Sequence, residues 1–346
     1  MTHPALPDWL KYQALINGAW VPAEDGRCFD VVNPASQSVI ARVANCGAAE
    51  TVAAIDAASN AQARWAARPA KEKAALLRRW FDLVMAQQEQ LAQLLTLEQG
   101  KPLAEARAEI AYGASYIEWF SEEAKRIYGH TIPGPSADKR VITLKQPVGV
   151  VACITPWNFP NAMLTRKIAP ALAAGCTVVC KPANETPLSA LALADLAMQA
   201  GIPDGVINVL CGETEAIGQA LTRSTKVRKL TFTGSTRVGK MLAADCAATM
   251  KRTTMELGGD APFIVFADAD LDAAVAGAVA SKYRNAGQTC VCANRILVHD
   301  EIYDAFVEKL ARSVEAFELG DGSQAGVTMG PLIHRGAAEK VASLVS

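Results

Sequence analysis

Short apolar stretches alternate with longer amphipathic ones through the middle of the chain. The short stretches are rich in valine, isoleucine and threonine, which favour strands, whereas the longer ones repeat apolar residues at helical spacing. Strands are predicted at 148–154, 177–180, 206–210, 229–233 and 253–257, with helices at 160–174, 187–200, 213–222 and 235–247. This alternation predicts an α/β fold, a parallel doubly wound sheet with helices on both faces.

The two ends of the chain carry different patterns. After an extended lead-in, helices are predicted at 70–99 and 103–127, and Gly100 with Pro102 marks the end of the first. A glycine- and proline-rich loop follows, and then a strand at 141–144. Beyond residue 257 the predicted elements are a strand at 263–266, a helix at 270–285, a strand at 296–299 and a helix at 301–316, which form a second, smaller α/β unit.

The bulk composition excludes several classes of partner. The chain has 346 residues, and 34 basic against 35 acidic residues leave no net field that would attract nucleic acid or an anionic membrane. The longest apolar run, 168–180, is interrupted by Pro170 and Gly175, so no membrane span is predicted. The first residues lack the apolar core of a signal peptide.

The nine cysteines and four histidines suggest neither a disulfide framework nor a metal site. Nine is an odd number, no Cys-x-x-Cys pair occurs, and the histidines are scattered. We therefore expect no metal and a reducing cytoplasmic compartment.

Four short motifs carry candidate chemistry. Cys290 lies in Gly-Gln-Thr-Cys-Val-Cys, and a thiolate is a strong nucleophile. Glu256 opens Glu-Leu-Gly-Gly and is a candidate base that activates water. Asn158 lies between two prolines, and Gly234-Ser235 joins a predicted strand to a helix, where N–H groups can meet a phosphate.

In this order and spacing, the four motifs resemble those of the aldehyde dehydrogenase superfamily across nearly the whole chain. The resemblance implies that Cys290 is the nucleophile, that Asn158 stabilises the oxyanion and that Glu256 is the general base. Lys167 and Arg284 are candidate cations that lower the pKa of the thiol. A cofactor-independent thiol esterase, using Cys290, Asn158 and Glu256 alone, is an alternative.

The resemblance also implies a nicotinamide dinucleotide as cofactor. The implied contacts are Thr155, Pro156, Trp157, Asn158, Lys181, Pro182, Ala183, Asn184, Gly234, Ser235, Gly239 and Leu257. NAD-preferring relatives often have a glutamate where this chain has Asn184. A carboxylate about 5 Å from a 2′-phosphate would repel it by up to several kcal/mol, so neutral Asn184 predicts NADP, with NAD also possible.

Two arginines indicate the substrate. Within the family the resemblance is strongest to the succinate-semialdehyde branch, in which Arg166 and Arg284 match positions that hold the distal carboxylate of the substrate beside Cys290. Arginine binds a carboxylate through two charge-assisted hydrogen bonds. Glutarate semialdehyde would keep every contact and add one methylene, worth about 1–3 kcal/mol, so it stays an alternative.

The resemblance divides the chain into four parts: 1–126, a helical part of the cofactor-binding domain; 127–150, an oligomerisation hairpin; 151–257, the dinucleotide-binding domain; and 258–346, an incomplete catalytic domain. Members of the superfamily continue beyond this point, so a catalytically impaired dinucleotide-binding remnant is a further alternative. Otherwise we expect a homo-oligomer that acts on a small aldehyde.

Cys292 lies two residues after the nucleophile. A disulfide across one residue is strained, and strained bridges are readily reduced. Reversible oxidative inactivation through a Cys290–Cys292 bridge is therefore a hypothesis, and a second packed thiol is its alternative.

Overall fold

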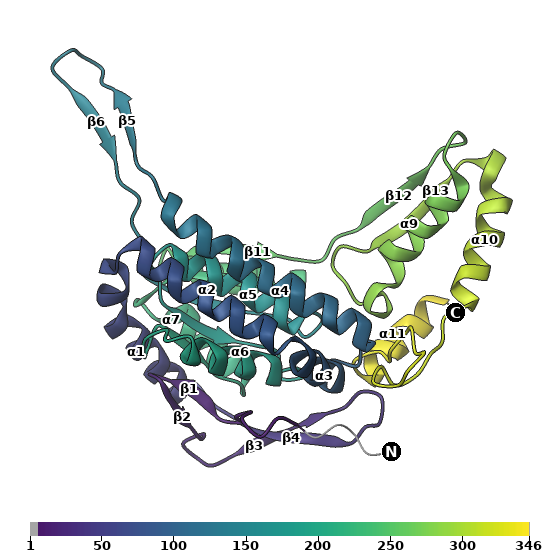
Figure 1. Cartoon of the computed structure of the whole chain (residues 1–346), viewed down its shortest axis with the longest axis horizontal. Helices are drawn as coiled ribbons and strands as arrows, with labels where there is room; N and C mark the ends of the chain where they lie inside the picture. The colour runs from purple at the N-terminus through teal and green to yellow at the C-terminus, as the bar shows by residue number, and fades with distance from the viewer. Residues whose placement is uncertain (1–5, 346) are drawn as a thin grey trace.

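A seven-stranded sheet forms the centre of the molecule (Figure 1). The computed structural model describes residues 6–345. The strand order is β11 (Arg252–Glu256), β10 (Val227–Thr233), β7 (Val150–Ile154), β8 (Val178–Lys181), β9 (Ile207–Val209), β1 (Ala14–Ile16) and β2 (Ala19–Val21). The strands from β11 to β9 are parallel, whereas β1 pairs antiparallel with both β9 and β2. The predicted parallel sheet is confirmed, and the extended lead-in adds an antiparallel edge.

The chain winds outward from the middle of this sheet in two directions. It runs from β7 to β8 and β9, then crosses to the other side of β7 to form β10 and β11. The connecting helices are α5 (Pro160–Ala173), α6 (Leu188–Gln199), α7 (Thr214–Arg223) and α8 (Thr236–Ala247). The direction therefore reverses between β7 and β10, and in such sheets ligands bind beyond the carboxyl ends of the strands at this point.

Four helices from the first third of the chain precede β7: α1 (Ala48–Ala67), α2 (Ala70–Ala86), α3 (Gln88–Gln99) and α4 (Leu103–Glu123), followed by a 3₁₀ turn η1 (Ala124–Arg126). The prediction of one helix over 70–99 was wrong, because the chain breaks at Gln87 and α3 turns to pack against α4 and α6. The sequence analysis missed α1, whose buried face is mostly alanine and contrasts weakly with its polar face.

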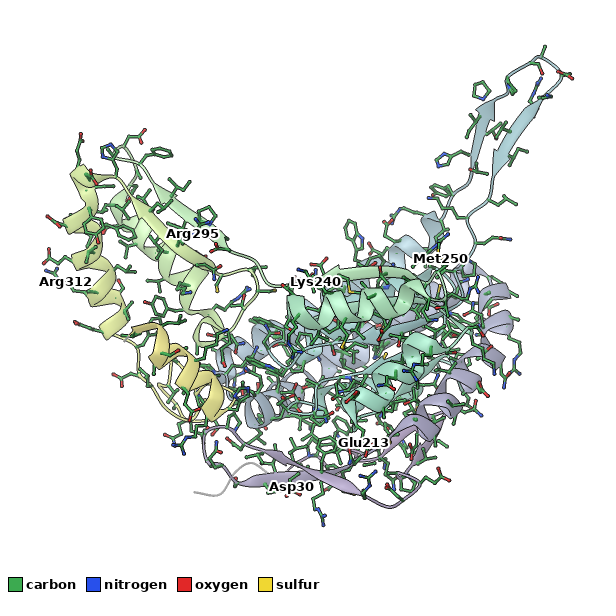
Figure 2. All side chains as sticks on the ribbon, turned by 180° about the vertical axis from the view of Figure 1, so that it is seen from behind. Asp30, Glu213, Lys240, Met250, Arg295 and Arg312 are labelled. Carbon is green, nitrogen blue, oxygen red and sulfur yellow. The ribbon has the colours of Figure 1, made fainter. Side chains whose placement is uncertain are left out.

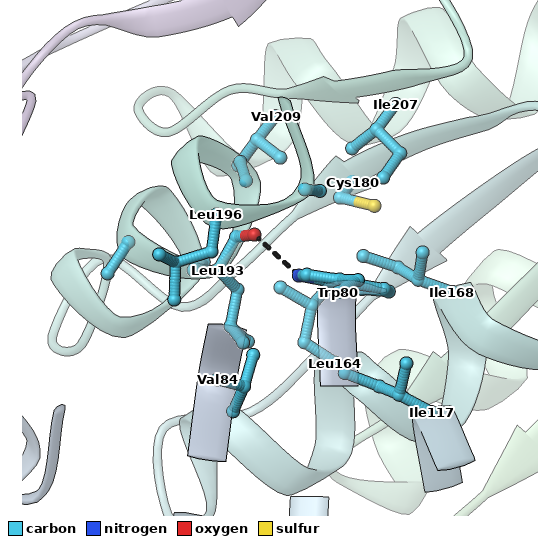
Figure 3. Close-up of a cluster of buried hydrophobic side chains, with 14 of the residues drawn as sticks. Trp80, Val84, Ile117, Leu164, Ile168, Cys180, Leu193, Leu196, Ile207 and Val209 are labelled. Carbon is cyan, nitrogen blue, oxygen red and sulfur yellow. Dashed lines mark hydrogen bonds between the residues drawn. The ribbon is translucent and has the colours of Figure 1, made fainter. Parts of the chain in front are cut away.

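Trp80 joins α2 to α6 through a buried hydrogen bond. Its indole is fully buried among side chains of α4, α5 and α6, and its Nε1–H donates to the carbonyl oxygen of Leu193 at 3.1 Å (Figure 3). A buried indole needs such an acceptor, because an unpaired N–H would cost about 1–3 kcal/mol. These contacts hold α2 in place against α5, which is the helix that follows the Asn158 loop.

Glu98 at the end of α3 caps the start of α6. Its buried carboxylate accepts the backbone N–H groups of Leu188 at 2.7 Å and Ser189 at 2.9 Å. Pro187, the residue at the N-cap position, has no side-chain acceptor of its own. Burial raises the pKa of Glu98 to about 8, although the two N–H donors act in the opposite direction.

A small lobe follows β11. It contains the parallel pair β12 (Ala261–Val265) and β13 (Ala293–Val298) with α9 (Leu271–Tyr283), the 3₁₀ turns η2 (Arg284–Gly287) and η3 (Asp300–Ile302), and α10 (Tyr303–Glu315). Figure 2 shows Arg295 and Arg312 on this lobe, apart from Lys240 and Met250 on the main body. Its core is small, and Ile264 is more than half exposed.

Two hairpins and a last helix complete the described chain. The hairpin β3 (Cys28–Val32) and β4 (Val39–Ala44) packs on the body, and α11 (Arg335–Val345) follows the lobe. The hairpin β5 (His130–Pro133) and β6 (Arg140–Thr143) extends away from the body (Figure 1). Within residues 6–345, no helix combines the length and the hydropathy needed to cross a membrane.

The raised pKa of Glu98 predicts a pH-dependent stability. The folded state holds this proton more tightly than the unfolded chain, so the contribution is complete below the unfolded pKa and is lost as the pH rises toward about 8. Between about pH 5 and pH 8, the free energy of unfolding of the wild type should fall by about 2–4 kcal/mol relative to Glu98→Gln, which does not titrate there. Urea unfolding measures both, and parallel pH profiles would contradict the prediction.

Candidate active site

The residues predicted to contact the dinucleotide gather along one edge of the sheet. Residues 155–158 follow β7, residues 182–184 follow β8 directly after Lys181 at its end, Gly234 and Ser235 follow β10, and Leu257 follows β11. The strands that they follow are parallel, so all these segments lie at the carboxyl edge, next to the reversal between β7 and β10.

Polar atoms at this edge fit a bound nucleotide. The side-chain oxygens of Thr155 and Thr233, at the ends of β7 and β10, are buried and have no hydrogen-bond partner within residues 6–345. Ser235 caps α8 by accepting the N–H of Val238 at 3.3 Å. The dipole and free N–H groups at the start of α8 suit a phosphate.

Gly239 lets α8 approach the strand that ends at Glu256. A Cβ at this position would lie 2.5 Å from Cδ2 of Leu257, much closer than two carbon atoms can pack. The backbone N–H of Gly234 also donates to the carbonyl oxygen of Glu256 at 3.1 Å. The turn at Gly234 and Ser235 and the Glu256 motif are separate in the sequence, but they pack together and are hydrogen-bonded in the structure.

Lys181 and Asn184 form a hydrogen-bonded corner after β8. The Lys181 ammonium donates to Oδ1 of Asn184 at 3.2 Å and to the carbonyl oxygen of Pro182 at 3.0 Å. The Asn184 amide in turn donates to the carbonyl oxygen of Gly212 at 2.8 Å. Burial lowers the pKa of Lys181, and the side chain of Glu185 is exposed. The corner therefore combines a cation with a neutral neighbour.

Cys290 is exposed on a turn that the Asn158 loop contacts directly. The amide Nδ2 of Asn158 donates to the carbonyl oxygen of Gln288 at 3.0 Å, and an asparagine amide keeps a second hydrogen to donate. On the other side, a Cβ at Gly259 would lie 3.6 Å from the carbonyl oxygen of Cys290. The structure thus brings the Asn158 loop and the segment after Glu256 against the Cys290 turn.

Glu256, Lys167 and Arg166 share a cleft of roughly 430 Å³ with Thr231. The Lys167 ammonium donates to the Thr231 hydroxyl at 2.9 Å, and burial lowers the pKa of Lys167 to about 8. Cys290 is not among the residues that line this cleft. The structure therefore places Lys167 in the same cleft as the candidate base.

The two candidate substrate arginines rest on aromatic rings. The Arg284 guanidinium lies 5.2 Å from the ring centre of Phe159, and that of Arg166 lies 5.4 Å from the ring centre of Tyr116. Phe159 directly follows Asn158, so the Arg284 guanidinium lies next to the Asn158 loop. Arg166 lies in α5, about two turns after this loop.

Sequence reasoning missed a buried ion pair below the loop. Lys101 Nζ lies 2.6 Å from Oε2 of Glu109, and both side chains are buried. Lys101 also donates to the carbonyl oxygen of Asn158 at 2.9 Å and lies 3.9 Å from the ring centre of Phe159. The other oxygen of Glu109 accepts the N–H groups of Asn161 and Ala162 at 3.0 and 3.3 Å. Nothing in the sequence pattern places these two charges together.

Sequence reasoning also missed Asn285, which was placed inside a predicted helix at 270–285. That helix ends at Tyr283, because Asn285, Ala286 and Gly287 all have positive φ, at 54°, 55° and 73°. An asparagine close before a glycine is a common end of a helix, and this signal was available. Asn285 is almost fully buried between the Asn158 and Cys290 segments.

Cys292 is buried next to the turn that carries Cys290. Its thiol donates to the carbonyl oxygens of Thr289 at 3.1 Å and Gly287 at 3.5 Å, and both it and Cys290 are free thiols. These contacts fit a packed thiol, and the regulatory bridge stays a hypothesis. Within the described part of the chain, no group of three or more His, Cys, Asp or Glu residues is suited to hold a metal ion.

Comparison with known proteins decides the family. The pattern of the aldehyde dehydrogenase family matches residues 20–346. This chain belongs to the aldehyde dehydrogenase family. It is 60% identical to succinate-semialdehyde dehydrogenase [NADP(+)] of Escherichia coli, covering 96% of this chain and 69% of that protein. It is also 60% identical to glutarate-semialdehyde dehydrogenase of Pseudomonas aeruginosa, covering 96% and 68%.

A solved structure agrees with this assignment. The crystal structure of succinate-semialdehyde dehydrogenase from Burkholderia pseudomallei superposes with a TM-score of 0.96 at 57% identity, covering 97% of this chain and 70% of that one. The predicted family, fold and reaction class, NAD(P)-dependent oxidation of a small aldehyde, are thereby confirmed for this oxidoreductase. The roles of the individual residues stay predictions.

The buried ion pair predicts a large difference between two glutamates. Glu109→Ala leaves Lys101 charged and unpaired in the interior, so the free energy of unfolding should fall by about 3–5 kcal/mol. Glu89→Ala removes the partner of Arg107 in an exposed pair and should cost less than about 1 kcal/mol. Urea unfolding measures both variants. Equal losses of unfolding free energy in the two variants would show that the buried pair stabilises the fold no more than the exposed pair.

Proposed function

We propose that this enzyme oxidises succinate semialdehyde to succinate with NADP, through an acyl group on Cys290. The observation that carries this proposal is the hydrogen bond from the Asn158 amide to the Gln288 carbonyl, which places a side-chain donor two residues from an exposed thiol. A nucleophile and a preorganised donor at this separation suit attack on a carbonyl carbon.

The chemistry follows from three side chains. The Cys290 thiolate forms a bond to the aldehyde carbon, and the negative charge that develops on oxygen is stabilised by the free N–H of Asn158 and the backbone N–H of Cys290. A nicotinamide dinucleotide held at the sheet edge by residues such as Lys181 and Ser235 would supply the acceptor for the hydride of this carbon, so that Cys290 would carry a thioester. Glu256 takes a proton from water, which attacks the thioester and releases the acid with the thiolate restored.

The residues at the sheet edge would hold the cofactor. Thr155 and Thr233 offer hydroxyls without a partner within residues 6–345, the N–H groups at the start of α8 would bind the pyrophosphate, and Lys181 would bind the ribose of the adenosine half. The ammonium of Lys181 beside the neutral amide of Asn184 favours a 2′-phosphate, so NADP is the preferred cofactor and NAD is bound less tightly.

Lys167 affects the same chemistry through Glu256. The two share one cleft, where the Lys167 ammonium places a positive charge that supports the proposed base electrostatically. Because the pKa of Lys167 is about 8, this support weakens as the pH rises above that value.

The two arginines would bind the distal carboxylate of the substrate. Arg284 lies against the oxyanion loop and Arg166 lies in the helix that follows, and aromatic rings orient both guanidinium groups. Glutarate semialdehyde is the second candidate, supported by the equal identity to the relative of that name. Comparing kcat/KM for the two semialdehydes decides between them.

Removing either arginine tests the substrate assignment. Arg284→Ala and Arg166→Ala should each raise the KM for succinate semialdehyde about 10–100-fold, because a charge-assisted hydrogen bond contributes about 1.5–3 kcal/mol. The KM for butanal, which has the same chain length and no carboxylate, should change less than about twofold. An equal effect on both aldehydes, or none on the semialdehyde, would contradict carboxylate binding.

A wild-type chain that binds NADPH without any turnover would instead support the alternative of a catalytically impaired dinucleotide-binding remnant.

A single substitution after β8 tests the cofactor assignment. Asn184→Glu should raise the KM for NADP about 10–100-fold through repulsion of the 2′-phosphate, and change the KM for NAD much less. Asn184→Gln also disturbs the contact with Gly212 but stays neutral, so it separates charge from shape. Steady-state titration of both cofactors gives these values, and strict NAD dependence of the wild type would refute the assignment.

A further inference from the structure

The carbonyl oxygen of Asn158 has two side-chain donors from different segments of the chain. Lys101 Nζ donates to it at 2.9 Å, and the side-chain amide of Asn285, in the segment before Cys290, donates to it at 3.1 Å. The same Asn285 amide nitrogen lies 3.3 Å from the carbonyl oxygen of Gln288. Asn285 therefore bridges the two loops that carry the proposed nucleophile and the proposed oxyanion donor.

Contacts with both loops define the orientation of this amide. Both neighbours of its nitrogen are carbonyl oxygens, so the reversed amide would place oxygen against oxygen. The backbone N–H of Asn285 donates to the carboxylate of Glu105 at 2.8 Å, which fixes the residue to α4 as well. The Gln288 carbonyl also accepts from Asn158, so two side-chain amides converge on one backbone oxygen.

The backbone of this segment is strained. Ala286 has φ of 55°, in the left-handed region that residues with a Cβ rarely adopt. Such strain persists only where surrounding contacts over-determine the conformation. The contacts that do so here are those of Asn285 with Glu105, Asn158 and Gln288.

We propose that Asn285 is a positioning residue that sets the separation between the oxyanion donor Asn158 and the nucleophile Cys290. This inference rests on the proposed function of those two residues. Asn285 acts through the Asn158 loop: it holds the peptide of Asn158 so that the second amide N–H faces the carbonyl oxygen under attack. Because an oxyanion donor contributes only when correctly placed, losing this support should slow acylation.

The experiment measures acylation of the full chain by p-nitrophenyl acetate, which forms an oxyanion during attack and needs no cofactor. Asn285→Asp keeps the size of the side chain and the tolerance for positive φ, but replaces the donor by an acceptor. Its acylation rate should fall about 100-fold. Asn285→Gly, which also accepts positive φ, should show a similar fall. Asn294→Asp adds the same charge four residues after Cys290, keeps the acceptor for the Ala261 N–H, and should change the rate less than about twofold.

A double-mutant cycle separates positioning from general structural damage. In an Asn158→Ala background, which keeps the peptide carbonyl but lacks the donor, Asn285→Asp should slow acylation by less than about threefold further. A full additional 100-fold loss, or an unchanged rate in the single variant Asn285→Asp, would overturn the positioning role. If Cys290→Ala were acylated as fast as the wild type, the proposed function itself would fail.

Discussion

The buried Lys101–Glu109 ion pair is the interaction on which the arrangement of the active site depends. Transferring two charges into the interior costs several kcal/mol per ion, and their attraction offsets this cost only when further hydrogen bonds satisfy both groups. The Asn158 loop and the first turn of α5 supply these bonds: the loop gives one carbonyl to Lys101, and the helix gives two N–H groups to Glu109. If the loop moved, Lys101 and Glu109 would lose these hydrogen bonds while remaining buried. This cost holds the amide of Asn158 in place.

The sheet supplies the second constraint. Its parallel strands end at one edge. The topology of the sheet alone therefore brings residues from four separate segments together there. The short turns after β7, β8, β10 and β11 form the proposed cofactor edge, and the chain then passes directly from Glu256 to the small lobe, whose Cys290 turn packs against the segment after Glu256. The proposed nucleophile and the proposed cofactor edge thus belong to different units of the fold, joined by Asn158 and Asn285.

The sequence predicted what depends on local pattern. The alternation of β-branched and amphipathic stretches predicted the strands from β7 to β13, and the Cys290, Glu256 and Asn158 motifs predicted the family. The buried alanine face of α1 lacked contrast, so this helix was missed. Lys101, Glu109 and Glu98 were missed for another reason: each is an ionisable side chain whose buried hydrogen-bond partners include groups distant in the sequence, and no local pattern contains those partners.

Covalent capture of the substrate carbon by Cys290 is the central claim, and a stalled reaction tests it most directly. With Glu256→Gln the proposed base is lost, so the thioester should persist after hydride transfer. Mass spectrometry of this variant, incubated with succinate semialdehyde and NADP, should find a succinyl group on the peptide that contains Cys290, with one NADPH formed per modified chain. NADPH that accumulates without any modification, or a succinyl group on another residue, would contradict the account.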